Sequence, residues 1–221
     1  MLAVITLVIM LVVAYAHFRE GIFTALSMLI NIILAGVVTC NFYEPLADYV
    51  DPLLVGSFLA GYEDFLFMLL LFAGTLGLLR MVTNNLANIL IEYHPLLQQL
   101  GAGLLGLVSG YLLGGFLLCL LQTLPWHVNF MEFQPRDRQE SPLRGFFPSD
   151  RVWLALMRHA GAYALSRDPD NDNADSPFDR YATFDRPGNF ELRYLRYRRY
   201  NNTRNPMPYE RECDHTLKRR P

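Results

Sequence analysis

The residues of this chain that most resemble a ligand site form an acidic stretch in its last third, DPDNDNADSPFD. Oxygen-bearing side chains occupy positions 1, 3, 5, 9 and 12 of an EF-hand-like loop, where they would surround calcium; they are Asp168, Asp170, Asp172, Ser176 and Asp179. The stretch has Asn173 where that loop needs glycine, and Asp179 where it needs a bidentate glutamate. We therefore expect a solvated acidic linker over 168–179, and calcium binding there stays an open alternative.

Motifs of catalysis and of cofactor binding are missing from the sequence. It has no phosphate-binding loop, no dinucleotide glycine fingerprint, no HExxH motif and no GxSxG motif. The three cysteines, Cys40, Cys119 and Cys213, lack the paired spacing of a disulfide framework or a zinc site. We therefore expect a non-enzymatic protein with no catalytic residues, no cofactor and no metal.

The charges of the chain divide it into two parts. The whole chain has 221 residues, of which 52% are hydrophobic, and a net charge of −2. Residues 1–121 contain two basic and seven acidic residues, which gives −5, whereas 122–221 contain 17 basic and 14 acidic residues, which gives +3. The first part is too apolar for a soluble domain, and the small basic excess of the second gives no support for a nucleic-acid partner.

Four apolar stretches are long enough, with their flanks, to cross a bilayer: 1–16, 22–42, 65–79 and 100–121. A helix needs roughly 17–25 residues to cross the hydrocarbon layer, and in lipid the backbone groups must be bonded within the helix. A cleaved signal peptide is the alternative for the first stretch, but no Lys or Arg precedes Arg19. We predict an all-α membrane protein with four transmembrane helices.

Ionisable and polar side chains are rare inside these stretches. Arg80 follows the third, where a charge is a functional hypothesis by default, although its guanidinium could also extend to the interface. Asn31 in the second is expected to hydrogen-bond a neighbouring helix. Between the third and fourth stretches, apolar residues recur at helical spacing, at Leu86, Ile89, Leu90 and Tyr93. They predict either a helix in the membrane interface or a packed extension of the third helix.

Glycines form a stripe on the fourth stretch. Gly106, Gly110 and Gly114 are four residues apart, and Gly103 lies beside the same stripe. Small residues let helix backbones approach closely in lipid, where no hydrophobic force drives helices together. The stripe predicts ordinary packing within the chain, or alternatively a hinge or a seam between the protomers of a homo-oligomer.

Basic residues in short loops indicate the cytoplasmic side of a membrane protein. Arg19 follows the first stretch and Arg80 follows the third, whereas the loop over 43–64 carries only acidic charges. This pattern places the first and third loops in the cytoplasm and favours a C-terminal tail outside, although the 17 basic residues of the tail argue for the opposite orientation. Trp126 is expected to anchor the end of the fourth helix at the interface.

We divide the chain into a membrane domain over 1–121 and a short extramembrane module over 122–221. In the module, Ser149 or Asp150 is expected to cap an amphipathic helix over about 151–165. This helix is predicted to dock on the membrane surface or on its own bundle, with a partner helix as the alternative.

The rest of the module has strong turn residues and many aromatic and basic side chains. Pro187 and Gly188, with alternating aromatics after them, predict a small hairpin over about 181–199. Its arginines and tyrosines suit lipid headgroups or solvent better than nucleic acid. Residues 201–221 are expected to be disordered.

The order and spacing of these segments resemble the CvpA family, the colicin V production proteins of bacterial inner membranes. The resemblance covers about residues 1–121 and includes HFREGI at 17–22, NFYEPLA at 41–47 and LGAGLLG at 100–106. It implies a multi-pass inner-membrane protein associated with toxin production or export and with envelope physiology. It supplies no catalytic residues.

We therefore expect an accessory protein of toxin production or secretion and of envelope maintenance. Its partners would be the lipid bilayer, an unknown envelope or secretion component and possible further copies of itself through the fourth helix. The alternative is a small channel or transporter subunit in which the glycine-rich fourth helices meet at a protomer seam.

Overall fold

A computed structural model describes residues 2–54, 62–86, 95–124 and 148–162, together with Phe184, Asp185, Phe190 and Tyr194. The helices in these residues are α1 (Leu2–Glu20), α2 (Ile22–Leu54), α3 (Glu63–Leu86), α4 (Pro95–Gln122) and α6 (Ser149–Ala162). No strand occurs among the described residues. The first four helices are each long and apolar enough to cross a membrane, which confirms the predicted all-α fold with four candidate spans.

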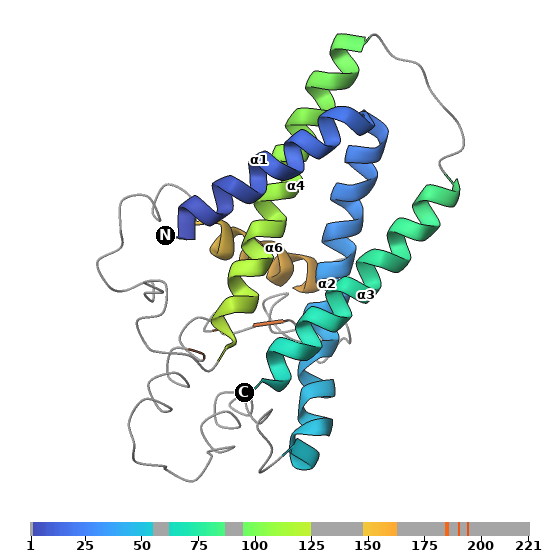
Figure 1. The fold of residues 1–221 in the computed structure, drawn as a ribbon. Coiled ribbons are helices and arrows are strands. Elements are labelled where there is room, and N and C mark those ends of the chain that lie inside the picture. Colours follow the sequence, from blue (N-terminus) through green and yellow to red (C-terminus); the bar gives the residue numbers. More distant parts are fainter. Residues whose placement is uncertain are drawn as a thin grey trace.

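The four long helices run antiparallel to their chain neighbours (Figure 1). α1 packs mainly on α4, and α2 packs mainly on α3; contacts between α2 and α4 join the two pairs. One end of the bundle holds the α1–α2 turn, the end of α3 and the start of α4. The other end holds the N-terminus, the start of α3 and the end of α4 (Figure 1).

The outer faces of the helices are apolar. Val12 of α1, Leu78 of α3 and Leu104 of α4 are each more than 60% exposed. Exposure of such a surface to water would cost about 25 cal/mol of free energy per Å², whereas the acyl chains of lipids are themselves apolar. The side chains that are buried instead pack where α2, α3 and α4 meet.

α2 is longer than predicted, because residues 43–54 are helical and only part of the expected acidic loop connects α2 to α3. Pro45 has no N–H for a helical hydrogen bond, yet the helix continues past it. Tyr43 and Ala47 are buried, and the Tyr43 ring lies 6.2 Å from that of Phe184. This tertiary packing explains why the helix does not end near residue 42.

For the segment between the third and fourth spans, two alternatives were predicted: a helix in the membrane interface, or an extension of the third helix. Residues 81–86 continue α3, so in this part the extension of the third helix is found. α4 begins at Pro95, because the first turn of a helix does not need the N–H group that proline lacks. Residues 87–94 lie outside the described part of the chain.

α6 docks on its own bundle. It begins at Ser149, two residues before the predicted start, and is described to Ala162. In Figure 1 it lies across α4 and extends towards α2. Trp153 and Met157 on its apolar face are almost fully buried. The position of the helix is therefore set by this buried face and not by the membrane surface.

The predicted capping role of Ser149 and Asp150 is wrong, because both residues lie inside α6. Ser149 Oγ forms a 3.0 Å hydrogen bond with Thr6 Oγ1 of α1. Asp150 Oδ2 accepts one of 2.9 Å from Gln122 Nε2 of α4. Both side chains therefore connect α6 to the bundle.

The predicted hairpin is wrong at the two positions where its second strand is described. Phe190 and Tyr194 are both helical, and their ring centroids are 4.8 Å apart. Residues four positions apart face each other on a helix, so this aromatic contact favours the helical conformation. The rest of the predicted hairpin lies outside the described residues, as do the acidic stretch over 168–179 and Trp126.

Candidate functional site

The glycine stripe of α4 lies against α1. A Cβ atom placed on Gly106 would be 2.7 Å from the Cα of Ala14, and one on Gly110 would be 2.6 Å from the Cα of Met10. One on Gly114 would be 3.3 Å from Cγ2 of Thr6. The contacts advance by four residues on both helices, as expected for two antiparallel helices in close backbone contact.

Gly103, the remaining glycine of the predicted stripe, has a looser contact. A Cβ atom there would lie 3.5 Å from Cδ2 of Phe18, which is ordinary van der Waals contact. The stripe thus packs most tightly in the middle of α4 and opens towards the start of that helix.

Two further glycines, which were not among the residues selected from the sequence, pack against α6. A Cβ atom on Gly36 of α2 would overlap the ring of Trp153, and one on Gly115 of α4 would overlap the carbonyl oxygen of Ser149. Glycine is needed at both positions because α6 approaches the backbones of the two spans.

Aromatic rings fill the bundle where α6 enters. The rings of Phe72 on α3 and Phe116 on α4 are stacked, with centroids 3.8 Å apart. The indole of Trp153 meets both edge-on, at 6.3 Å from Phe72 and 5.6 Å from Phe116. Such contacts contribute beyond their buried area, so this cluster couples α3, α4 and α6.

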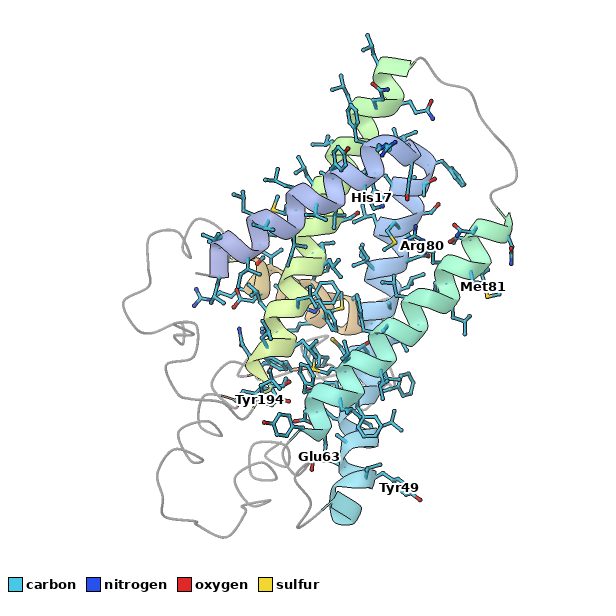
Figure 2. All side chains as sticks on the ribbon, viewed as in Figure 1. His17, Tyr49, Glu63, Arg80, Met81 and Tyr194 are labelled. Atoms are coloured by element: carbon cyan, nitrogen blue, oxygen red, sulfur yellow. The ribbon has the colours of Figure 1, made fainter. Side chains whose placement is uncertain are left out.

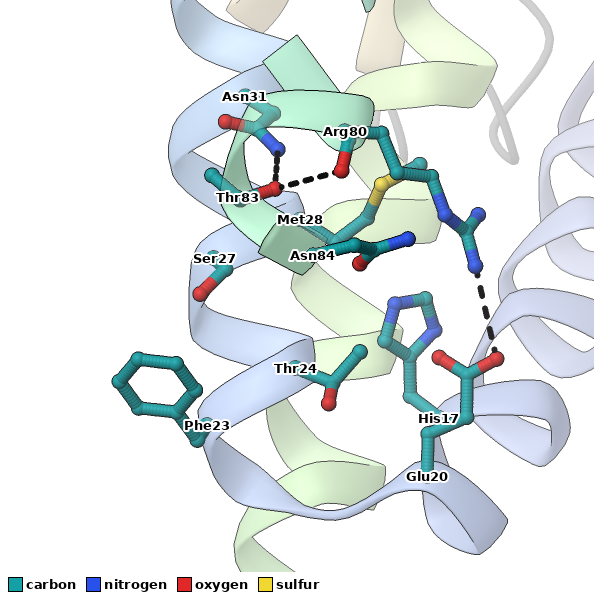
Figure 3. A pocket seen from close by; sticks show the side chains of 10 residues that line it. All are labelled: His17, Glu20, Phe23, Thr24, Ser27, Met28, Asn31, Arg80, Thr83 and Asn84. Carbon is teal, nitrogen blue, oxygen red and sulfur yellow. Dashed lines mark hydrogen bonds and ion pairs between the residues drawn. The ribbon is translucent and has the colours of Figure 1, made fainter. Parts of the chain in front are cut away.

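A polar recess lies at the opposite end of the bundle, between the end of α1, the start of α2 and the end of α3 (Figures 2 and 3). Phe23 and Met28 contribute apolar contacts to it. Its polar lining consists of His17, Glu20, Thr24, Ser27, Asn31, Arg80, Thr83 and Asn84. A cluster of ionisable and hydrogen-bonding side chains within membrane-spanning helices is the strongest candidate for a functional site in the described part of the chain.

The tight turn at Gly21 brings the first two helices to the recess. Gly21 has a φ of +102°, in the left-handed region that favours glycine. Its N–H donates to the carbonyl of His17, and its own carbonyl accepts from the N–H of Ala25. One residue therefore ends α1 and starts α2, which places the last turn of α1 beside the first turns of α2.

Two interactions connect the helices around the recess. The guanidinium Nη2 of Arg80 lies 3.6 Å from Oε1 of Glu20, which joins α3 to α1. Asn31 Nδ2 donates a 3.1 Å hydrogen bond to Thr83 Oγ1, which joins α2 to α3. The Thr83 hydroxyl donates in turn to the Leu79 carbonyl at 2.9 Å. The predicted hydrogen bond of Asn31 to a neighbouring helix is confirmed.

His17 is the most enclosed ionisable side chain of the recess. It is 5% exposed, and its Nδ1 lies 2.8 Å from the carbonyl oxygen of Val13. Because a carbonyl only accepts, Nδ1 carries the proton, and in the neutral ring Nε2 is left as a hydrogen-bond acceptor. Figure 3 shows the ring beside Glu20 and Thr24, facing the interior of the recess.

Most of the chain matches one protein family. The family model described as "Colicin V production protein" matches residues 2–149, which is more than half of the chain. The chain belongs to the CvpA family. No curated protein and no solved structure matches it. The family match extends past residue 121, where the sequence resemblance was expected to end, up to the first residue of α6. With its four candidate spans, the CvpA-family chain is a multi-pass membrane protein.

The residues selected from the sequence lie at different places in the CvpA-family chain. Arg80 lines the recess, whereas Arg19 is exposed one residue before Glu20 and does not line it. Trp126 lies outside the described residues. The four glycines of the stripe contact α1; an oligomer through α4 stays a prediction.

Most residues of the recess were not predicted from the sequence, although a pattern in the sequence points to them. Thr24, Ser27 and Asn31 are spaced by three and four residues on α2, and Thr83 and Asn84 follow Arg80 at the same spacing on α3. Residues with this spacing share one helix face. Two polar faces at the ends of adjacent spans predict a shared polar site.

Metal ligands do not gather in the described part of the CvpA-family chain. Among those residues, no group of three or more His, Cys, Asp or Glu side chains could hold a metal ion. Cys40 and Cys119 are both buried thiols outside any disulfide, and the thiol of Cys119 lies 3.6 Å from the carbonyl oxygen of Asp150.

Proposed function

We propose that this CvpA-family chain is a non-enzymatic component of the bacterial inner membrane that supports the production or export of a colicin V-like toxin and the maintenance of the envelope. It acts through contacts with an envelope or secretion partner and with lipid. The family match over 2–149 supports this proposal, because it includes all four candidate spans.

An accessory role is favoured over a channel because aromatic side chains fill the interior of the bundle. Phe72, Phe116 and Trp153 occupy the space between α3, α4 and α6. The glycine face of α4, which a protomer seam would require, is covered by α1 of the same chain. A closed bundle presents surfaces to partners, whereas a channel needs a continuous polar path.

The positions of the charged residues support a tail on the outer side of the inner membrane. Arg80 lies nearer than Glu63 to the end of the bundle that holds the α1–α2 turn (Figure 2). Arg19 is in the last turn of α1, at that same end, whereas Glu63 and Asp64 begin α3 at the other end. Tyr194 of the tail donates a 2.8 Å hydrogen bond from its hydroxyl to Asp64 Oδ2. The basic end would face the cytoplasm, and the tail would lie on the opposite side.

Labelling of the chain's own thiols tests this orientation. Cys40 and Cys119 are buried, so a membrane-impermeant maleimide should react at Cys213. Labelling of cells with a permeabilised outer layer supports an external tail. Labelling only after lysis contradicts it; a variant in which Cys213 is replaced by serine controls for reaction elsewhere.

Complementation tests the proposed function. The chain is expressed in a colicin V-producing strain that lacks its own family member, and toxin is measured separately in cells and in medium. We expect the chain to restore extracellular toxin. Gly115→Val, which would displace α6, should abolish this effect, whereas Gly77→Val, where an added Cβ atom would meet no packing neighbour within 4 Å, should preserve it. Normal membrane levels without restored toxin would contradict the proposal.

A small channel or transporter subunit is the second candidate, and the polar recess is the observation in its favour. Purified protein in liposomes separates the two candidates. Solute flux that is abolished by Gly110→Leu would support the channel, whereas liposomes that remain sealed at all protein densities would support the accessory role.

A further inference from the structure

The polar recess lies at the depth of the lipid headgroups. On α3 no charged residue occurs between Asp64 and Arg80. Arg80 follows Asp64 by 16 positions, which span about 24 Å at 1.5 Å per residue, about 6 Å less than the hydrocarbon layer of about 30 Å. With Asp64 at one interface, the long side chain of Arg80 can bridge this difference and bring its guanidinium to the headgroups at the other interface.

The recess is open to the outside of the bundle. Phe23, which lines it, is 53% exposed, and the side chains of Arg80 and Glu20 are 48% and 39% exposed. Phe23 begins an exposed apolar stripe on α2 that continues with Leu26 and Ile30 towards the centre of the span. An acyl chain can lie along this stripe while its headgroup occupies the recess.

The lining offers one cation beside one anion. The 3.6 Å pair of Arg80 and Glu20 is half-exposed, and such pairs contribute little to stability, so a ligand can separate it at low cost. Arg80 is suited to phosphate, which its planar guanidinium can bind through two hydrogen bonds. Glu20 and the Nε2 atom of His17 are acceptors for an N–H donor.

We propose that the recess binds the headgroup of a zwitterionic phospholipid that carries a primary ammonium, as in phosphatidylethanolamine. The phosphate is bound by Arg80 at the mouth, and the ammonium donates to Glu20 and His17. This proposal concerns lipid recognition and does not depend on a role in toxin production.

The hydrogen-bond acceptors of the recess favour a primary ammonium over other headgroups. An ammonium group can donate hydrogen bonds to Glu20 and His17, whereas the trimethylammonium of phosphatidylcholine has no N–H. The glycerol of phosphatidylglycerol offers no positive charge to Glu20, so that carboxylate would repel the anionic lipid.

Native mass spectrometry of the full chain tests the proposal. Protein freed of lipid in detergent is mixed with phosphatidylethanolamine, phosphatidylcholine and phosphatidylglycerol of identical acyl chains, and the retained lipids are counted. We expect phosphatidylethanolamine to be retained about tenfold more than either competitor, a ratio that corresponds to about 1.4 kcal/mol.

Single substitutions distinguish the recess from general lipid contact. Arg80→Gln should lower retention of all three lipids in the first bound position. Glu20→Gln should remove the preference for phosphatidylethanolamine over phosphatidylglycerol. Arg19→Gln is the matched control, because Arg19 is exposed at the same depth but does not line the recess, and it should leave both quantities unchanged.

Three results would overturn the proposal. Equal retention of the three lipids by the unmodified chain would show ordinary boundary lipid. Equal effects of Arg19→Gln and Arg80→Gln would show a general electrostatic attraction. Preference for phosphatidylglycerol that Glu20→Gln leaves unchanged would show recognition of phosphate alone. Thermal unfolding of each variant in detergent, compared before and after addition of phosphatidylethanolamine, provides an independent readout that folding is intact.

Discussion

Gly110 of α4 and Met10 of α1 are in backbone contact, because a Cβ atom on Gly110 would lie 2.6 Å from the Cα of Met10. No side chain separates the two helices at this point. The association of α1 with the bundle therefore depends on close van der Waals packing, which is what holds helices together in lipid.

A methyl group at this contact should loosen the pair. We expect Gly110→Ala to lower the free energy of unfolding by about 1–3 kcal/mol, the usual cost of overpacking. Thermal unfolding in detergent measures the effect. Gly74→Ala on α3 is the matched control, because a Cβ there meets nothing within 4 Å; equal losses in both variants would contradict the assignment.

Removal of the Trp153 ring should release α6. Trp153 is fully buried and contacts Phe72 and Phe116, so Trp153→Ala should cost about 3–5 kcal/mol. Limited digestion with trypsin, which can cleave after Arg158, should proceed much faster in this variant. Val152→Ala, at a 40% exposed position on the same helix, should digest at the unmodified rate.

The Asn31–Thr83 hydrogen bond should contribute modestly to stability. Hydrogen bonds between membrane helices average about 0.6 kcal/mol in double-mutant cycles. We expect this coupling when Asn31→Leu, Thr83→Val and the double variant are compared by unfolding in detergent. Additive effects of the two single substitutions would show that the bond has no energetic role.

A side chain at Gly21 should strain the turn that forms one wall of the recess. The φ of +102° is costly for any residue with a Cβ, by roughly 1–2 kcal/mol. Gly21→Ala should lower the unfolding temperature, whereas Gly77→Ala, in open space on α3, should leave it unchanged or raise it. A similar unfolding temperature for Gly21→Ala and the unmodified chain would argue against this turn.

The four spans could be predicted because each depends on a local property, the length of an apolar run. The end of α2 could not, because Tyr43 is buried against the tail residue Phe184, which is distant in sequence. The same reason applies to Ser149, whose hydroxyl could cap a helix but bonds Thr6 of α1 instead.

The candidate site shows the same limit. Arg80 could be selected because the sequence alone shows a charged residue directly after an apolar run. Its neighbours His17 and Glu20 reach it only through the turn at Gly21, and no property of either residue alone predicts that meeting. Likewise, Gly36 became important only because Trp153 of α6 packs on it.

The glycine stripe of α4 packs on α1 of the same chain, and a disulfide between α1 and α4 tests this packing directly. A Cβ on Gly114 would lie 3.7 Å from the Cβ of Thr6, within the range of about 3.5–4.5 Å that a disulfide needs. The test uses Thr6→Cys with Gly114→Cys in a chain whose natural cysteines are replaced by alanine.

Mild oxidation of membranes followed by non-reducing gel electrophoresis gives the result. We expect the double variant to form a bond within one chain, seen as a faster-migrating monomer that reductant reverses, and Gly114→Cys alone to remain monomeric. Cross-linked dimers of Gly114→Cys, without an internal bond in the double variant, would place the stripe between protomers and contradict the account.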